Sequence, residues 1–553
     1  MNLFVPLLPV LYLIGAIAWV LLNRRQAAVA PWIPVAATAA GLLVAIALAG
    51  TTASITLLRW EPVMDFGGAI TFAVDPITSA FLVLIAVLAL AAALNRQRDE
   101  TAGGPHLVTA ALLLSSAAVS FILANNLLTL ACAWVWLDAA AIMALRWRQD
   151  DPAPKALRVQ AFSLNYLTGL ALFVAAAATT ISGPMLAGAF WAPGMVNGLP
   201  AALIALAAVV RLGVYPFHRN MPDAGSGPLA AWLRLVPLAV GAYLLTRAAS
   251  LAIGPPLTGI LWSILIAGSA LAAAGMAVSA TNRLDMLRWL SAYAGATLAQ
   301  GATTGGVLAA PLAVAGSIVL VLAIGVLFLA ESLPQTRWIP WVRALAALAI
   351  LGLPLTLGFI YRWGVYSAAL GTGDGVTAVI MAFAAAIAAG ALWVIFRSPA
   401  PADPSASPDP LPAVGVVLLA APIVILGVLP SILQAAFEIA AGQPMPDTLT
   451  AWLAGGAGPL GVSVALLIAV PMACGWGLAR VRERLMSASP VQSWRYYLAL
   501  DWVYTVHWRP AGLIGQIYRS FRQLFENERY VGFVVVLALI LGLILLSQQQ
   551  LPQ

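Results

Sequence analysis

Charge is scarce in this sequence, and lysine is almost absent from it. Of the 553 residues, 8% are charged and 62% are hydrophobic, and Lys155 is the single lysine. A soluble domain of this size carries far more charge on its hydrated surface. The composition therefore excludes a soluble globular protein and indicates a polytopic membrane protein.

The residues that build metal, redox and catalytic centres are also few and scattered. Cys132 and Cys474 both lie in apolar runs without a CxxC companion, which argues against zinc, iron–sulfur clusters and disulfides. His106, His218 and His507 are far apart in the sequence. The P-loop (GKS/T), metalloprotease (HExxH) and nucleophile-elbow (GxSxG) motifs are missing as well. We therefore expect no cofactor, no metal site and no catalytic residue.

Apolar runs of membrane-spanning length recur along the whole chain. A helix needs about 20 apolar residues to cross a bilayer core, and sixteen segments approach or reach that length. The first has no basic segment before it and no small-residue cleavage site after it, so we expect a retained helix and not a signal peptide. The segments are 3–22, 31–49, 72–94, 105–123, 126–145, 160–181, 199–217, 228–250, 257–280, 287–305, 308–331, 341–369, 375–396, 411–437, 458–479 and 530–547.

The basic residues are distributed unevenly over the loops between these segments. Of the 27 basic residues, 22 fall in odd-numbered loops, and the even-numbered loops hold Arg59 and Arg247. The remaining three, Arg211, Arg234 and Arg362, lie inside predicted helices. The positive-inside rule then places the odd loops in the cytoplasm and both chain ends on the other side of the inner (plasma) membrane. The net charge of +7 is thus a topology signal, and we expect no nucleic-acid partner.

Two arginines lie at membrane depth in the stretch 209–247. Arg211 lies five residues before Pro216, and Arg234 lies six residues after Pro228. A cation at membrane depth costs at least about 2.5–3.5 kcal/mol, so such a residue marks a functional site by default.

Asp138 is the one acidic residue deep in a predicted helix. A buried carboxylate without a partner becomes protonated or costs several kcal/mol. Asp138, Arg211 and Arg234 each lie six or seven residues from the cytoplasmic ends of their helices, so we predict equal depths and one buried cluster with an ionised Asp138. A static ion pair that locks three helices and a titrating relay are both open at this point.

The stretch around Arg211 also carries several short sequence motifs in a characteristic order. Arg211 is followed by YPFH at 215–218, MPDA at 221–224 and GAYL at 241–244. This order resembles the signature of the antiporter-like proton-channel subunits, which include the large membrane subunits of respiratory complex I, Mrp antiporters and membrane-bound hydrogenases. The resemblance covers roughly residues 70–440. It departs from the family at the two positions that matter most, because the family's lysine is Arg211 here and its histidine is Arg234.

Further motifs of the resemblance bear on the proposed site. The segment 124–138 is similar to the family's A-D-N-L-L-x-x-Y-x-x-W-E, but Val135 occupies the glutamate position and Asp138 follows one turn later. The segment 352–362 resembles the second broken helix of the fold, with Arg362 in place of its lysine. The resemblance implies that the ion-pathway residues are Asp138, Arg211, Arg234, Arg362 and His218. The resemblance and the local proline and glycine content together predict helix breaks, which we place at Pro216, Pro354 and Gly358.

The segment 72–81, FAVDPITSAF, is similar to the family's entry into its third helix. Asp75 is the fourth residue of the predicted segment 72–94, close to the helix N-terminus, where a carboxylate is favoured by the free N–H groups and the helix dipole. We therefore interpret Asp75 as a helix cap and not as a proton carrier.

The resemblance implies an all-α polytopic membrane protein of about 16 transmembrane helices, two of them broken, with an antiporter-like inverted-repeat core. We expect N-terminal helices in 1–100, a first repeat in 101–250, a second repeat in 251–440 and a C-terminal region in 441–553. The C-terminal region contains an amphipathic segment, 486–529, predicted to lie along the cytoplasmic face, and a final helix.

Three functional readings follow from these residues. The first is an antiporter-like, non-catalytic membrane subunit of an ion-translocating complex, similar to NADH:quinone oxidoreductase or hydrogenase, with other membrane subunits as partners. Its conduction would be impaired, since arginine stays protonated where the family has a lysine that can release its proton. The second is a membrane subunit for bicarbonate or CO2 uptake with a soluble, zinc-binding cytoplasmic partner. The third is a non-conducting scaffold.

Cysteine labelling tests the predicted topology. Single cysteines at Asp99, Asp150 and Pro401, with Cys132 and Cys474 replaced by serine, should react with an impermeant maleimide from the cytoplasmic side only. Labelling of any two of them from outside intact cells would overturn the topology.

Overall fold

The computed structural model describes residues 4–96, 105–146, 164–175, 199–220, 228–251, 260–304, 308–397 and 410–500, with short gaps at 27, 64–65, 332, 334–337, 442–445, 447, 456–458, 487–493 and 496. The chain divides into two units, Met1–Arg495 and Tyr496–Gln553. The first unit contains nearly all described residues. The predicted final helix and most of the amphipathic segment lie outside them.

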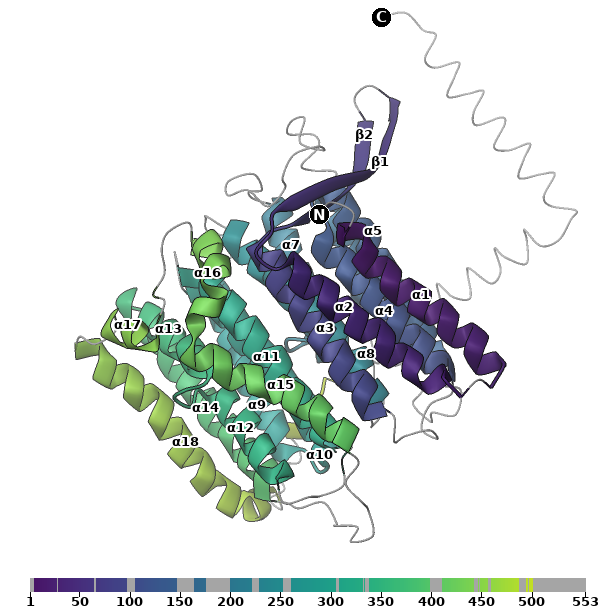
Figure 1. The fold of residues 1–553 in the computed structure, drawn as a ribbon. Helices are drawn as coiled ribbons and strands as arrows, with labels where there is room; N and C mark the ends of the chain where they lie inside the picture. The colour runs from purple at the N-terminus through teal and green to yellow at the C-terminus, as the bar shows by residue number, and fades with distance from the viewer. Residues whose placement is uncertain are drawn as a thin grey trace, which may run out of the picture. The chain divides into compact units, whose positions relative to one another are not determined.

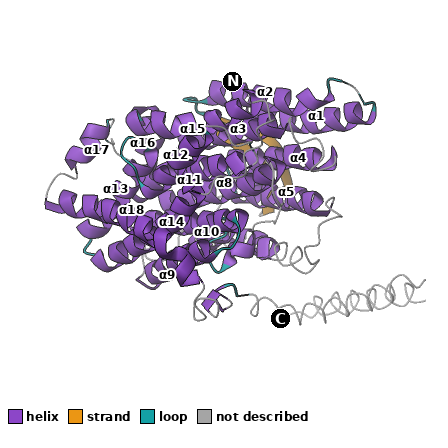
Figure 2. Cartoon of the chain, turned by 90° about the horizontal axis from the view of Figure 1, so that it is seen from below, coloured by secondary structure: helices purple, strands orange, loops and turns teal. Residues whose placement is uncertain are grey.

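The first unit is a bundle of α-helices with one β-hairpin (Figures 1 and 2). A further helix, Leu164–Ala175, lies between α5 and α7 in the sequence. The labelled elements are α1 (Phe4–Arg24), η1 (Ala30–Trp32), α2 (Ile33–Leu48), β1 (Ala53–Val63), β2 (Phe66–Val74), α3 (Pro76–Arg96), α4 (Pro105–Leu123), α5 (Leu127–Arg146), α7 (Leu199–Arg211), η2 (Phe217–Asn220), α8 (Pro228–Leu251), α9 (Ile260–Ser279), α10 (Arg283–Thr304), α11 (Ala309–Glu331), α12 (Ile339–Leu351), α13 (Leu357–Gly371), α14 (Gly375–Arg397), α15 (Pro410–Val428), η4 (Pro430–Leu433), α16 (Gln434–Ala441), α17 (Leu449–Gly455) and α18 (Pro459–Met486).

The helices have the length and composition of membrane spans. Within the described part of the chain, nine helices are long and apolar enough to cross a bilayer, and four shorter apolar helices accompany them. The expectation of a helical, multi-pass membrane protein is therefore confirmed. At the centre lies α11, whose residues Ala309 to Ala330 are all buried. A helix that is apolar on every side is stable only when neighbours cover it all round, and α8, α10, α12, α13 and α15 do so here.

The β-hairpin is an element that the sequence analysis did not predict. Strands β1 and β2 pair antiparallel, and the hairpin extends beyond the helix ends in Figure 1. Strand β2 is tied to the start of α5, because the Asn126 Nδ2 donates to the Ala69 carbonyl at 2.6 Å. The predicted helix 72–94 began too early, since its first three residues belong to β2.

Two helices are interrupted inside the bundle. Helix α7 ends at Arg211, and a turn leads through the cis peptide Tyr215–Pro216 into η2. The predicted helix 341–369 is two helices, α12 and α13, and Gly352 between them has a left-handed φ of +89°. Pro354 lies within this second interruption, and Gly358 is the second residue of α13.

Glycines allow the interrupted chain to pack against its neighbours. A Cβ at Gly241 of α8 would lie 2.9 Å from the Leu212 nitrogen, and one at Gly295 of α10 would lie 3.2 Å from the Leu212 oxygen. A Cβ at Gly358 would lie only 1.8 Å from the Ala349 oxygen of α12. The start of α13 can therefore approach α12 only with glycine at this position.

Substitution of Gly358 by alanine should destabilise the second interruption. Overpacking a filled site typically costs about 1–3 kcal/mol, and here the contact atom is backbone that cannot rotate away. We expect a clear drop in the thermal unfolding midpoint of the detergent-solubilised protein. Gly268→Ala in α9 is the matched control, because its Cβ would meet nothing within 4 Å. Equal midpoints for the two variants would show that the approach of α13 to α12 is not tight.

Candidate functional site

The structure joins Asp138 and Arg211 in a buried ion pair. The Arg211 Nη2 lies 2.7 Å from the Asp138 Oδ1, and the two side chains are 2% and 8% exposed. The guanidinium carbon also lies 4.0 Å from the ring centre of Trp134, one helical turn before Asp138 on α5. The end of α7 is thereby held against one face of α5 by a charge-assisted hydrogen bond and a cation–π contact.

Trp134 in turn fixes a third helix. Its indole Nε1 donates to the Asn165 carbonyl at 3.1 Å, at the start of the helix Leu164–Ala175. The side chain that stacks on Arg211 is therefore itself held in place. The pair is a preorganised unit of α5, α7 and the helix between them in sequence.

Arg234 contacts different helices. Its Nη2 donates to the Ser291 hydroxyl of α10 at 3.3 Å, and its guanidinium lies 5.5 Å from the Phe328 ring of α11. These contacts lie towards the second half of the chain, whereas the Asp138–Arg211 pair joins helices of the first half.

The predicted equal depth of Arg211 and Arg234 is wrong. The Arg211 Cβ would lie 3.2 Å from a Cβ at Gly241, so Arg211 is level with Gly241 on α8. Gly241 follows Arg234 by seven residues, which is about 10 Å along a helix. The chain after Arg211 is not helical, and non-helical chain covers more distance per residue. Counting residues from the helix end therefore placed Arg211 too shallow.

Arg362 binds the broken end of α12. Its Nη2 donates to the Tyr293 hydroxyl at 2.7 Å, and its Nε and Nη2 lie 3.3 and 3.2 Å from the Ile350 carbonyl oxygen. Ile350 is in the last turn of α12, where carbonyl groups lack intrahelical partners and the helix dipole favours a cation. Arg362 is 3% exposed, and it acts as a side-chain cap for the interrupted helix.

Helix α10 lies against both interruptions. Ser291 accepts from Arg234, Tyr293 accepts from Arg362, and Gly295 packs on Leu212 at the broken end of α7. These three residues occupy little more than one turn. Helix α10 therefore packs against both interruptions that the sequence predicted, the one after α7 and the one between α12 and α13.

His218 lies just after the first interruption, in η2. Its ring is stacked on Tyr215 with centroids 5.7 Å apart and lies 4.3 Å from the Trp289 ring of α10. The structure thus places His218 in an aromatic cluster at the beginning of α10.

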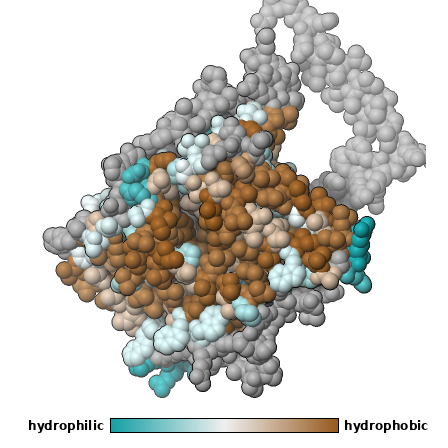
Figure 3. All heavy atoms as spheres, in the orientation of Figure 1, coloured by the Kyte–Doolittle hydropathy of each residue, from teal (hydrophilic) through white to brown (hydrophobic). Residues whose placement is uncertain are grey.

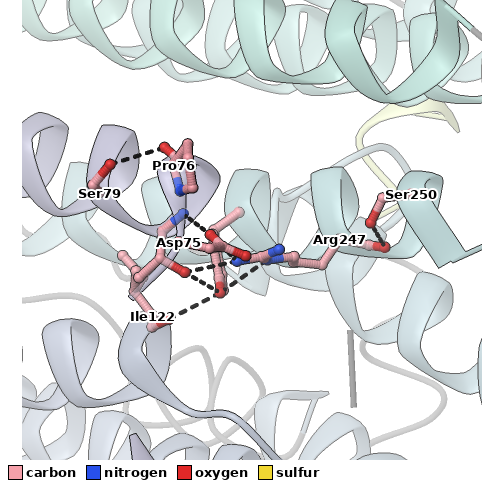
Figure 4. A network of polar contacts seen from close by, with 8 residues as sticks. Asp75, Pro76, Ser79, Ile122, Arg247 and Ser250 are labelled. Carbon is pink, nitrogen blue, oxygen red and sulfur yellow. Dashed lines mark hydrogen bonds and ion pairs between the residues drawn. The ribbon is translucent and has the colours of Figure 1, made fainter. Parts of the chain in front are cut away.

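The sequence analysis did not predict a second ion pair, in which the arginine is buried and the carboxylate is partly exposed. Arg247 was counted in a loop, but it lies in α8, is buried, and pairs with Asp75 at 2.7 Å. It also donates to the Thr78 hydroxyl at 2.6 Å and to the Tyr243 hydroxyl at 3.1 Å, and Tyr243 donates to the Ile122 carbonyl at 2.9 Å (Figure 4). The network joins α3, α4 and α8 next to the base of the hairpin. The predicted segment 228–250 already contained Arg247, which was the available signal.

Asp75 is both a helix cap and an ion-pair partner. The Thr78 backbone N–H donates to its Oδ1 at 2.7 Å, which is the geometry of an N-cap. Burial raises the pKa of Asp75, but Arg247 and the Thr78 N–H outweigh this effect and bring the pKa below its ordinary value. The carboxylate is therefore ionised at neutral pH.

Three buried arginines, Arg234, Arg211 and Arg247, lie at successive levels along the axis of α8. Arg234 and Arg247 are thirteen residues apart, about 20 Å along the helix, and Arg211 lies at the level of Gly241 between them. The Phe121 ring lies between the partners of Arg211 and Arg247, 5.7 Å from Trp134 and 6.3 Å from Tyr243.

Comparisons with known proteins place this arrangement in a known fold. No protein-family model matches the chain, and no curated protein matches it either. Among solved structures, a chain of the Mrp complex from Dietzia sp. DQ12-45-1b superposes with a TM-score of 0.76 at 18% identity, over 99% of this chain and 63% of that one. A chain of the membrane-bound sulfane sulfur reductase, an archaeal respiratory membrane complex, gives 0.68 at 20% identity, over 99% and 100%. A chain of respiratory complex I from Thermus thermophilus gives 0.63 at 17% identity, over 79% and 98%.

The chain has the fold of these membrane-complex chains. The sequence resemblance to antiporter-like subunits pointed to the same group of complexes, so that prediction is confirmed at the level of the fold. The chain spans 63% of the length of the Mrp-complex chain.

The Asp138–Arg211 pair should be a large contributor to stability. Removing one partner of a buried pair typically costs about 3–5 kcal/mol, because the other charge is left uncompensated. Asp138→Asn should therefore lower the free energy of unfolding, measured in detergent with denaturant, by about this amount. Asp285→Asn is the matched control: Asp285 binds Arg288 at the same 2.7 Å but is 33% exposed, and such a pair contributes about 0–1 kcal/mol. Similar losses in both variants would show that burial adds nothing to the Asp138 pair.

Proposed function

We propose that this chain is an antiporter-like membrane subunit of a multisubunit, ion-translocating complex of the complex I-like or hydrogenase-like kind. Two independent observations support the proposal. The sequence carries the ordered motif around Arg211, and the fold matches chains of three membrane complexes over 79–99% of this chain. In this role the chain is a non-catalytic subunit, and other membrane subunits are its partners.

The observation that carries the mechanism is a buried arginine at each interrupted helix. Arg211 ends α7 and is bound to Asp138, and Arg362 binds the end of α12. A guanidinium remains charged at any physiological pH and cannot hand on a proton, whereas a buried lysine can. In the proposed mechanism these arginines hold fixed positive charge in the pathway, and conduction through the chain is weak.

The remaining parts of the proposal concern topology and organisation. The one-sided distribution of basic residues over the loops supports a topology with both chain ends on the non-cytoplasmic side of the plasma membrane. Residues 101–250 and 251–440 form the two antiporter-like repeats, with α10 between their interrupted helices. Arg234, which reaches from α8 to Ser291, links the first repeat to the second.

Proton flux into proteoliposomes tests the fixed-charge mechanism. With a potassium diffusion potential as driving force, the full-length chain should pass protons only slightly faster than protein-free vesicles leak them. Arg211→Lys combined with Arg362→Lys should raise the flux several-fold, because lysine can lose its proton when buried. Arg288→Lys, at a partly exposed helix start, is the control and should leave the flux unchanged.

Two outcomes would contradict this mechanism. Strong flux through the unaltered chain that Arg211→Lys abolishes would show that the guanidinium is required for conduction. A double-lysine variant that folds but stays at the background rate would show that the two sites do not lie on a pathway.

Purification from native membranes tests the assignment to a complex. The tagged chain, extracted in mild detergent, should co-purify with other membrane subunits and with redox or quinone-site subunits. A soluble zinc-binding protein as the sole partner would instead favour the uptake of inorganic carbon.

A further inference from the structure

A cavity of about 400 Å³ opens on the apolar face of the helical unit. Its walls come from α2, α3, α11, α15 and α16, and Figure 3 shows the surface hollowed between the side of α2 and α3 and that of α15 and α16. On α3 the lining residues Ala80, Val83 and Val87 follow one another at helical spacing, so one stripe of that helix faces the cavity.

The lining has almost no polar group that could form a hydrogen bond with water. Ser79 is the one lining residue with a polar side chain, and its hydroxyl already donates to the Pro76 carbonyl of its own helix at 3.0 Å. A stable buried water needs several polar partners, and an apolar cavity without them stays dry. The occupant that fits this lining is hydrocarbon.

The mouth of the cavity is continuous with the surface that the bilayer covers. Ile46 on α2 and Ile432 on η4 line the cavity and are themselves more than half exposed, as lipid-facing side chains are. Hydrocarbon chains therefore lie at the entrance, and an empty cavity would forfeit the dispersion contacts of its lining atoms. We propose that this cavity binds an acyl chain of a membrane phospholipid.

The cavity brings that acyl chain to the centre of the bundle. Ile318 and Leu322 of α11 line it, although α11 is otherwise covered by protein along its whole length. Ser317, next to Ile318, lies 3.2 Å from the Thr246 hydroxyl of α8. The acyl chain thus packs between α3 on one side and α11 and α15 on the other, close to the Thr246–Ser317 contact of the core. This site does not depend on the proposed ion pathway.

Photolabelling in nanodiscs tests the site. The full-length chain is embedded in phosphatidylcholine that carries a diazirine in the middle of one acyl chain, and labelled residues are mapped by mass spectrometry. We expect label on Ile318 or Leu322, as well as on lipid-facing Leu43. Ala80→Phe should fill the cavity and remove the label from α11 while Leu43 stays labelled. Val379→Phe, on an exposed position of α14, should leave the α11 label unchanged.

Ala436→Phe fills the cavity from the opposite wall and should have the same effect as Ala80→Phe. Wild-type protein with label on Leu43 and none on α11 would overturn the proposal, since it would show a cavity filled by water or protein. An α11 label that persists in both filled variants would also overturn it. Displacement of the label by an added prenylated quinone, but not by unlabelled phospholipid, would reassign the cavity to an isoprenoid tail and so contradict the phospholipid assignment.

Discussion

Backbone polar groups that are freed inside a bilayer must find partners within the protein, and both interrupted helices of this chain depend on that requirement. At the second interruption, Arg362 reaches back from α13 to the Ile350 carbonyl at the end of α12. At the first, the Ser269 hydroxyl of α9 donates to the Tyr215 carbonyl at 2.6 Å. Side chains from neighbouring elements thus replace the missing helical hydrogen bonds, and the surrounding helices are positioned to supply them.

Arginine suits this structural task, and in the proposed mechanism it limits proton conduction. Its planar group carries several donors, so one side chain can bind a carbonyl and a hydroxyl together, as Arg362 does with Ile350 and Tyr293. The same group never gives up its proton, so the charge at Arg211 is permanent and Asp138 is committed to balancing it. In the mechanism that we propose, the contacts that hold the interrupted helices together are also the contacts that oppose proton transfer through them.

Much of the helical layout could be predicted from apolar runs, because in a bilayer length and hydropathy alone define a span. The predicted segment 375–396 differs from α14 by one residue. The hairpin could not be found in this way, since it lies beyond the helix ends and pairs through its backbone. The pairing of Asp138 with Arg211 was predictable from their rarity. The depth of Arg234 relative to Arg211 and the partners of Arg247 could not be predicted, because they depend on how the interrupted chain packs in three dimensions.

A double-mutant cycle between Asp138 and Arg211 tests most directly whether a buried ion pair holds the first interruption. The free energies of unfolding are measured for Asp138→Asn, Arg211→Met and the double variant. The account predicts strong coupling, with the double variant less destabilised than the sum of the singles by at least about 1.5 kcal/mol, because each single variant leaves one buried charge uncompensated. Additive effects of the two substitutions would contradict it.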